Sequence, residues 1–399
     1  MPVISAPALY VFPSDLLDEG VTAVVERSIE LGTTLAVAMA YHQARDLVPH
    51  AGSKPRIRYR QDGVFFEPDA FWPPATPLPR VQSLQERTAV RELLDRDDLP
   101  RPEAWTVFLH NTGLGQEQPE LATLTCFGDS ILSNLCPSNP TVSDYADALA
   151  SAVSSLGMDI IAEALSAQTF AHGSHHERAF SPLGEGEQAM LGICFCEHCL
   201  QRAAAHEVDG ESVAERAREH LQRAFASERA TPATRESLAE SLGEEVLTYL
   251  GVREQAVSEL TGRVAATVHG AGKQLSFMDL TGAVLGYDSG MPSGALAAEH
   301  AWRLSIDPAA AAGSADSYTI LGYTRDPERL SGDVASYRAA VGSAHLRVIL
   351  RPGHPDASSA AQLRDHVAAA REGGADQIDF YNYGMYDQAV LDRIPTALA

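Results

Sequence analysis

The stretch TVSDYADALASAVSSLGMDIIAE, residues 141–163, decides the fold. Residues 141–156 predict a helix, which leads directly into Met158-Asp-Ile-Ile-Ala-Glu163, a short apolar run that predicts a strand. A helix that alternates with short, nearly continuous apolar strands is typical of parallel α/β folds. This strand ends in a carboxylate, Glu163.

The same alternation extends in both directions from this stretch. Further strands are predicted at 8–12, 33–41, 105–110, 274–280, either 303–307 or 317–323, 346–351 and 377–383. Helices are predicted at 21–31, 293–302, 327–340 and 359–372, with a last short helix after them. Eight strand–helix units predict a (β/α)8 TIM barrel. The rival, an open doubly wound sheet, needs a glycine-rich turn after an early strand, which Gly113-Leu-Gly115 does not complete.

Two long segments interrupt this alternation. Residues 197–269 are rich in Ala, Glu, Arg and Leu, and they predict two or three long helices without a strand. We interpret them as a helical insertion between strands four and five. Residues 50–104 are rich in proline and predict a long loop over the barrel mouth. Residues 1–399 as a whole are interpreted as a single barrel domain.

Composition limits the partners. The chain has 399 residues, 45% of them hydrophobic, and a formal net charge of −23 without a run of basic residues. Nucleic acid and anionic membranes are therefore unfavourable partners, and a neutral, sugar-like or cationic small molecule fits better. No signal peptide or membrane span is predicted, so we expect a cytoplasmic protein with reduced thiols. The oligomeric state stays open, a homo-oligomer included.

The cysteines indicate a metal site. Cys194-Phe-Cys196-Glu-His-Cys199 places three thiols on a tight turn at the start of a helix. Zinc prefers four tetrahedral ligands, and thiolate is among the best of them. The fourth ligand can be Cys136, Cys126 or His198, and Cys136 is preferred because the prolines after it suit a rigid ligand loop. Four thiolates would close the metal to substrate, so this zinc would be structural. Three thiols without a metal are the alternative.

The pairing of Cys136-Pro-Ser-Asn-Pro with the later C-x-C-x-x-C motif resembles the zinc site of family 42 glycoside hydrolases, the β-galactosidases, and of related barrel proteins. The resemblance covers about residues 105–200. It implies a structural zinc, and it implies that the glutamate at the end of strand four, Glu163, is the acid/base. Ala162 stands where the family has asparagine. Strand seven, which carries the family's nucleophilic glutamate, ends in Leu350-Arg351-Pro-Gly-His354 and has no glutamate.

Polar residues recur where the predicted strands end, which is where barrel active sites lie. We expect Glu163 and Asp279, with Asp307 as the next choice, to supply the two carboxyl groups that glycoside hydrolysis needs. The loop after strand four contributes three histidines and a glutamate that can bind substrate, transfer protons or hold a second metal. The residues expected to bind substrate are Tyr41, His42, Arg45, Asp46, His110, Asn111, His172, His175, His176, Glu177, Arg351, Tyr381 and Tyr383.

The sequence thus predicts an enzyme that cleaves a glycosidic bond by carboxylate acid/base catalysis. One alternative is a carbohydrate-binding barrel without catalysis, which the absent strand-seven glutamate favours. The other is a barrel lyase or isomerase that uses the histidines and a catalytic metal. A second, chelator-labile metal ion would distinguish the last class.

Overall fold

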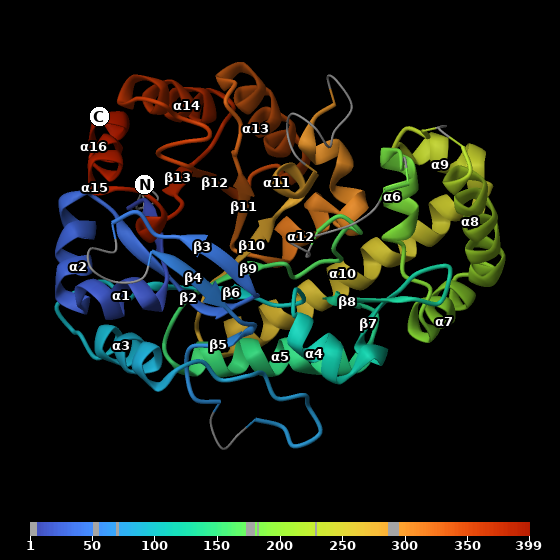
Figure 1. Ribbon diagram of the computed structural model, residues 1–399, viewed down its shortest axis with the longest axis horizontal. Coiled ribbons are helices and arrows are strands. Elements are labelled where there is room, and N and C mark those ends of the chain that lie inside the picture. The colour runs from blue at the N-terminus through green and yellow to red at the C-terminus, as the bar shows by residue number, and fades with distance from the viewer. Residues whose placement is uncertain are drawn as a thin grey trace.

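The computed structural model describes residues 6–50, 56–68, 72–172, 180–181, 183–227, 230–285 and 295–399. Within these ranges, eight parallel strands close into a barrel (Figure 1). They are β1 (Ala8–Val11), β2 (Thr34–Tyr41), β6 (Glu103–Val107), β9 (Ile160–Glu163), β10 (Leu275–Asp279), β11 (Ser317–Leu321), β12 (His345–Leu350) and β13 (Gln377–Phe380). Each strand pairs with the next in this order, and β1 pairs with both β2 and β13. The predicted TIM barrel is confirmed.

Helices surround the barrel (Figure 1). The α-helices are α1 (Pro13–Glu19), α2 (Val21–Glu30), α3 (Leu84–Leu94), α4 (Thr112–Glu117), α5 (Pro140–Ser155), α6 (Glu185–Leu191), α7 (Glu197–Ala205), α8 (Gly210–Phe225), α9 (Arg235–Leu242), α10 (Glu245–Gly270), α11 (Thr281–Leu285), α12 (Pro308–Ser314), α13 (Pro327–Val341), α14 (Ala360–Glu372), α15 (Gln388–Leu391) and α16 (Arg393–Leu398). The 3-10 helices are η1 (Pro119–Leu121), η2 (Ala297–Leu304) and η3 (Tyr383–Met385).

Helix capping and burial explain why residues 140–163 form helix α5 followed by strand β9. The side chain of Asn139 caps α5 by accepting a hydrogen bond from the Thr141 backbone N–H at 2.9 Å, and Pro140 occupies the first helical position. Buried residues line one side of α5, and β9 follows with three buried residues before the partly exposed Glu163. The strand is apolar because the barrel interior covers one face and the helices cover the other.

The structure settles the position of strand six and corrects the prediction for residues 50–104. Strand six is 317–321, because 303–307 includes the end of η2, where Ser305 adopts a left-handed backbone with φ of 56°. The segment 50–104 is not a plain loop, since its described part contains β4 (Ile57–Arg60), β5 (Gly63–Val64) and α3. β4 pairs with β3 (Ala44–Leu47) as a hairpin, and β5 pairs antiparallel with the last two residues of β2.

The described chain between β9 and β10 forms helices α6 to α10, which extend beside the barrel (Figure 1). They share a second hydrophobic core that includes the cysteines. The first part of α10, around Leu250, packs in this second core, whereas its last part, around Val264, packs in the barrel core. Thus α10 joins the two cores. A further antiparallel pair, β7 (Ala122–Leu124) and β8 (Ser130–Leu135), leads to the cysteine region.

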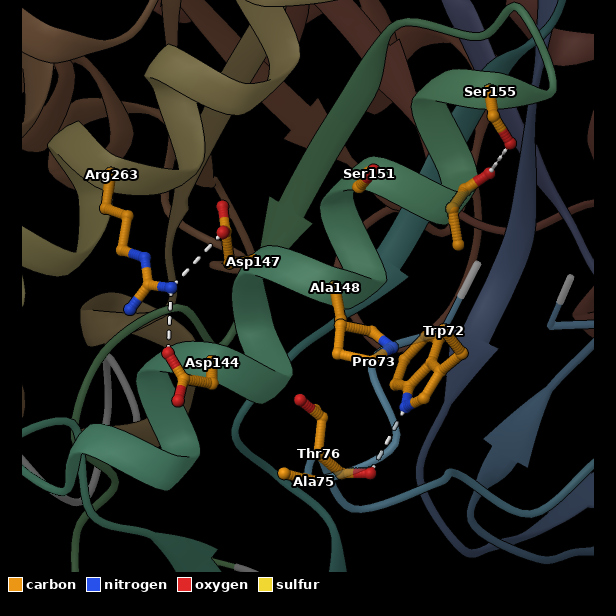
Figure 2. Close-up of a pocket in the computed structure, with 11 residues that line it drawn as sticks. Trp72, Pro73, Ala75, Thr76, Asp144, Asp147, Ala148, Ser151, Ser155 and Arg263 are labelled. Atoms are coloured by element: carbon orange, nitrogen blue, oxygen red, sulfur yellow. Dashed lines mark hydrogen bonds and ion pairs between the residues drawn. The ribbon is translucent and has the colours of Figure 1, made fainter. Parts of the chain in front are cut away.

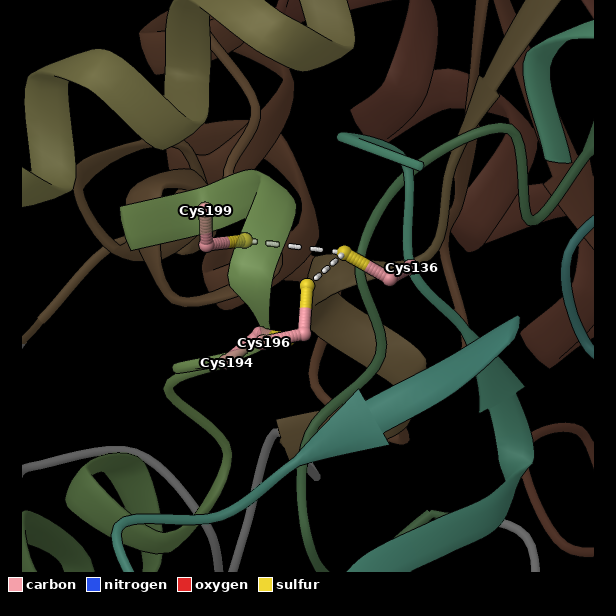
Figure 3. A group of neighbouring side chains, drawn as sticks. All are labelled: Cys136, Cys194, Cys196 and Cys199. Carbon is pink, nitrogen blue, oxygen red and sulfur yellow. Dashed lines mark hydrogen bonds between the residues drawn. The ribbon is translucent and has the colours of Figure 1, made fainter. Parts of the chain in front are cut away.

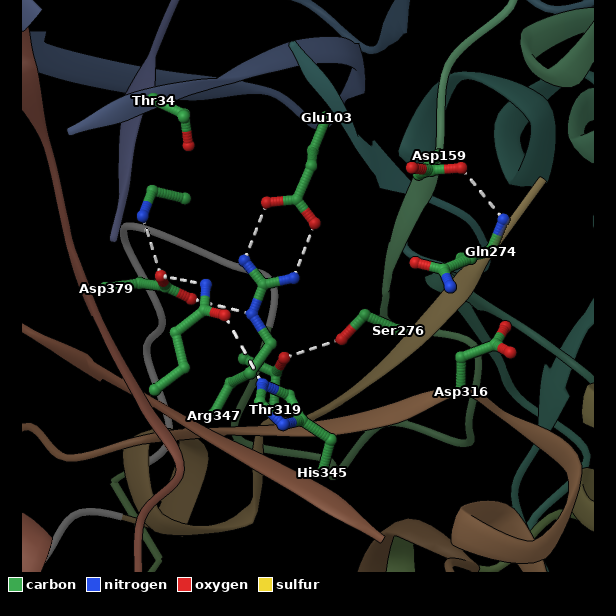
Figure 4. Close-up of polar contacts among 12 residues, drawn as sticks. Thr34, Glu103, Asp159, Gln274, Ser276, Asp316, Thr319, His345, Arg347 and Asp379 are labelled. Carbon is green, nitrogen blue, oxygen red and sulfur yellow. Dashed lines mark hydrogen bonds and ion pairs between the residues drawn. The ribbon is translucent and has the colours of Figure 1, made fainter. Parts of the chain in front are cut away.

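A buried ion network closes the N-terminal end of the barrel (Figure 4). Arg347 is 4% exposed and donates to Glu103 at 2.7 Å and to Asp379 at 2.8 Å. Asp379 also accepts from the side chain of Gln377 at 2.8 Å and from the backbone N–H of Ala8 at 2.7 Å. This network therefore ties β6, β12, β13 and β1 together, at the end of the barrel that serves stability.

Candidate active site and thiol cluster

Glu163 lies at the carboxyl end of β9, and its carboxylate accepts a hydrogen bond from the indole N–H of Trp105 on the neighbouring β6. Burial raises the pKa of Glu163 to about 7, and the hydrogen bond from Trp105 opposes part of that rise. A carboxyl group with this pKa is partly protonated at neutral pH. It can therefore donate a proton and take one back.

Aromatic side chains surround this carboxyl group. The Trp105 ring lies 4.8 Å from Tyr41, 5.2 Å from Tyr10 and 5.6 Å from Tyr381, measured between ring centroids. Because these rings come from β1, β2, β6 and the segment after β13, they meet in the barrel interior. The Tyr41 and Tyr381 hydroxyls are 3.4 Å apart. Burial raises the pKa of both tyrosines, and the charge of Glu163 raises it further.

Three predicted histidines continue from Tyr41 as a column of rings. Tyr41 stacks on His42 with a centroid distance of 4.3 Å, and His42 stacks on His110 at 4.3 Å with 14° between the planes. His172 meets His110 edge-on at 4.8 Å. The structure therefore brings these three histidines together in one column that begins at Tyr41. His175, His176 and Glu177, which continue the loop after His172, lie outside the described residues.

Asp46 is the second carboxylate near the tyrosine pair. It is 9% exposed and forms an ion pair with Arg60, whose guanidinium lies 3.6 Å from the centre of the Phe12 ring. Phe12 packs against Tyr41 at 4.9 Å. The charge of Asp46 also contributes to the raised pKa of Tyr41 and Tyr381. The two tyrosines thus lie within electrostatic reach of both Glu163 and Asp46.

Asp279 faces the other way. Met278 is the register partner of Glu163, and successive side chains of a strand alternate between its two faces, so Asp279 points toward the helices. Its carboxylate accepts from the hydroxyl of Tyr318 at 2.6 Å and from the backbone N–H of Thr281 at 2.8 Å. Burial raises its pKa, and these hydrogen bonds oppose that rise.

The end of β12 holds Arg351, the strand-seven residue predicted to bind substrate. Its guanidinium binds Asp356 through two hydrogen bonds of 2.6 and 2.7 Å. It also lies 4.3 Å from the centre of the Tyr323 ring, which in turn is 6.1 Å from Tyr381. Arg351 therefore borders the aromatic group around Glu163.

The remaining predicted residues lie farther out or serve local contacts. Arg45 is exposed on β3. Asn111 caps α4 and donates to the hydroxyl of Tyr145 at 3.4 Å. Tyr383 donates to Glu19 at 2.8 Å. Sequence reasoning missed Trp105, although its position two residues from the end of β6, on the same face as that strand's last residue, was a usable signal.

The four predicted zinc ligands form one buried cluster (Figure 3). The sulfur atoms of Cys136, Cys194, Cys196 and Cys199 all lie within 4.8 Å of one another. Cys136 lies 3.6 Å from both Cys196 and Cys199, close to the sulfur spacing of about 3.8 Å that a tetrahedral zinc site requires. The cluster can hold a metal ion. Cys126 is buried outside it, and burial raises its thiol pKa to about 11.

Local contacts fix the thiols. Cys136 directly follows β8, whereas Cys196 occupies the position just before the first residue of α7. The Leu124 backbone N–H donates to the sulfur of Cys194 at 3.3 Å, and the Tyr249 hydroxyl donates to the carbonyl of Cys194 at 2.7 Å. The cluster therefore connects the β7–β8 pair with α7 and α10.

No protein-family profile and no curated protein matches the chain. Solved structures match its fold. The PgaB (BpsB) glycoside hydrolase domain from Bordetella bronchiseptica has a TM-score of 0.55 and 12% identity, over 99% of this chain and 97% of that one. The β-galactosidase from the psychrophilic Marinomonas ef1 has a TM-score of 0.54 and 10% identity, over 98% of this chain and 58% of that one. The catalytic domain of a β-amylase from Paenibacillus polymyxa has a TM-score of 0.52 and 10% identity, over 99% of both.

These similarities establish the TIM-barrel fold, shared with glycoside hydrolases, and the chain spans only 58% of the β-galactosidase. Within the described residues, no helix is both long and apolar enough to cross a membrane.

Proposed function

We propose that the protein is a glycoside hydrolase in which Glu163 is the general acid. The observation that carries the proposal is the position of this carboxyl group: half-buried at the carboxyl end of a barrel strand, held by the Trp105 indole, with a pKa of about 7. Its proton would pass to the glycosidic oxygen as the bond from that oxygen to the anomeric carbon breaks. The similarity of the fold to glycoside hydrolases supports this reaction class.

The surrounding rings suit a sugar substrate. Sugars present apolar C–H faces together with hydroxyl groups, and aromatic side chains with polar tips can contact both. Tyr41 and Tyr381 lie beside Glu163, and the column of His42, His110 and His172 continues from them. We propose that these residues bind the sugar units on either side of the scissile bond.

Hydrolysis also needs a second carboxylate, which either takes a proton from the attacking water or forms a covalent bond to the anomeric carbon. The sequence predicts Asp279, but its side chain points toward the helices and accepts from Tyr318, so it would have to turn into the barrel to act as this carboxylate. Asp46 is the other candidate, and its ion pair with Arg60 beside the tyrosines supports it. Asp279→Asn and Asp46→Asn variants separate them, since only loss of the true second carboxylate lowers kcat by several orders of magnitude.

We further propose that Cys136, Cys194, Cys196 and Cys199 bind one structural zinc ion, as the resemblance to family 42 implies. Their buried, closely spaced sulfur atoms support it. Four thiolates leave no open position on the ion, so zinc would brace the second core and take no part in the reaction. The five cysteines form no disulfide bonds, which suits a reducing compartment, and we infer a cytoplasmic location.

The test compares wild type with Glu163→Gln on a panel of aryl glycosides. We expect turnover by the wild type and a loss of at least about 100-fold in kcat for the variant, since removing general acid catalysis has that effect. Glu120→Gln, at an exposed position, is the matched control and should keep full activity. Absence of turnover on every glycoside, or an unaffected Glu163→Gln enzyme, would overturn the proposal.

A carbohydrate-binding barrel without catalysis is the second candidate. The end of β12 favours it, because Arg351 follows Leu350 there and no glutamate is available as nucleophile. This candidate predicts that the wild type and Glu163→Gln bind the same oligosaccharides and that neither hydrolyses them. A second, chelator-labile metal ion needed for activity would instead indicate a barrel lyase or isomerase.

A further inference from the structure

A groove of about 510 Å³ lies outside the barrel, along the exposed face of α5 (Figure 2). Exposed positions of α5, such as Ser151 and Ser155, form part of its floor. Arg263 of α10 borders it on one side, and Trp72 with Thr76 borders it on the other. Its volume lies within the range of about 300–1,000 Å³ that is usual for small-molecule sites.

The charged side of the groove presents donors and acceptors next to each other. Arg263 donates to Asp144 at 2.8 Å and to Asp147 at 3.2 Å (Figure 2). The side chains of Arg263 and Asp144 are 44% and 55% exposed, so this pair contributes little to stability. A guanidinium offers only donors and a carboxylate only acceptors, so together they match the hydroxyl groups of a sugar, which both donate and accept.

The opposite side supplies an aromatic ring. Trp72 is half-buried, and its indole N–H donates to the carbonyl of Thr76 at 3.4 Å. Its ring packs edge-on against Tyr145 at 6.2 Å, which fixes its position. Tyr145 in turn accepts a hydrogen bond from Asn111 at 3.4 Å. Trp72 is more exposed than Trp105 and Trp302, which are both buried.

We propose that this groove is a second carbohydrate-binding site, which takes a neutral oligosaccharide with one sugar ring against Trp72 and neighbouring hydroxyls on Arg263, Asp144 and Asp147. An anionic ligand fits poorly because two carboxylates stand beside a single guanidinium. An apolar ligand fits poorly because charged and hydroxyl groups line much of the groove. The ligand class follows the proposed function, but the groove shares no lining residue with the candidate active site.

Binding is measured by calorimetry in the Glu163→Gln background, so that no probe is hydrolysed. The probes are cello-, malto-, galacto- and chito-oligosaccharides, each as tetra- to hexasaccharides. We expect at least one of them to bind at two sites, and Trp72→Ala to weaken one of the two binding events about tenfold, while Trp72→Phe, which keeps a ring, restores most of it. Tyr59→Ala is the control, since Tyr59 is 78% exposed and lies on β4, outside the groove.

A second variant keeps the test decisive if Trp72→Ala fails to fold. Ser151→Gln adds a longer side chain at an exposed helical position inside the groove, and we expect it to weaken binding as well. Failure of every probe to bind, or binding that neither variant changes, would overturn the inference.

Turnover of aryl glycosides separates this test from that of the proposed function. Binding that depends on Trp72, without any turnover, would overturn the proposed hydrolase function but support a carbohydrate site in the groove. Turnover together with binding that does not depend on Trp72 would support the hydrolase function and overturn the site in the groove.

Discussion

At the scale of single residues, the hydrogen bond from Trp105 influences the pKa of the candidate acid Glu163. The Trp105 hydrogen bond favours the charged carboxylate and lowers a pKa that burial has raised. Trp105→Phe removes this hydrogen bond, so we expect the pKa of Glu163 to rise further. If the protonated form is the active acid, the alkaline limb of the kcat/KM profile should move up by about one pH unit. Trp302→Phe, at another buried tryptophan, should leave the limb in place. A downward move in Trp105→Phe would contradict the assignment.

Glu163 should also lower the stability of the folded protein at high pH. Its pKa rises from 4.5 to about 7 on folding, so the unfolded chain loses this proton first as the pH rises. Folding stability therefore declines between about pH 4.5 and 7, by about 3 kcal/mol in total. Glu163→Gln does not ionise, so urea unfolding should show it to be more stable than wild type at pH 8 and closer to it at pH 4.5. Equal differences at both pH values would contradict this.

At the scale of elements, α4 packs so closely on β8 that only glycine fits between them. A Cβ atom on Gly115 would lie 1.9 Å from the carbonyl oxygen of Leu132, whereas a Cβ atom on Gly113 in the same helix would have 3.5 Å to its nearest neighbour. We expect Gly115→Ala to destabilise the protein by about 1–3 kcal/mol in thermal or urea unfolding. Gly113→Ala should be almost neutral. Similar values for both would show that the contact is not tight.

The thiol cluster gives a second prediction about elements. Cys196→Ser removes a ligand from the proposed zinc site, so metal analysis should show loss of about one zinc ion per chain, and the second core should melt earlier. Cys126→Ser leaves the cluster intact and should keep the metal, because Cys126 lies outside it. Zinc retained by Cys196→Ser, or lost equally from both variants, would sink the assignment.

Some of this could be predicted from the sequence. The strands were visible because buried parallel strands are continuous apolar runs, and the thiols because three of them stand within six residues. The face toward which the Asp279 side chain points could not be predicted. Successive side chains of a strand point to opposite faces, so an error of one residue in the predicted strand moves a side chain from one face to the other. The contact between Glu163 and Trp105, which are 58 residues apart in the sequence, depends on the register between β6 and β9. Strand β4 could not be predicted because it lies within the proline-rich segment 50–104.

At the scale of the whole molecule, Arg347 forms ion pairs with both Glu103 and Asp379 at the N-terminal end of the barrel. Arg347→Met leaves two carboxylates without their cation, and we expect a loss of about 3–5 kcal/mol in unfolding free energy. Arg96→Met is the matched control, because Arg96 pairs with Asp98 at the surface, where solvent screens the pair, and its loss should change the unfolding free energy far less. Equal losses for the two variants would show that the buried network contributes no more to the unfolding free energy than a surface ion pair does.

The closure of the barrel also shapes how the chain must fold. Ala8 on β1 and Asp379 on β13 are joined by a hydrogen bond, although 371 residues separate them. During synthesis, β1 can pair with β2 early, but its other edge has no partner until β13 emerges from the ribosome. An exposed strand edge invites pairing with other chains. Nascent or truncated forms that lack β13 should therefore depend on chaperones and aggregate, even though they contain the whole candidate acid–tryptophan pair.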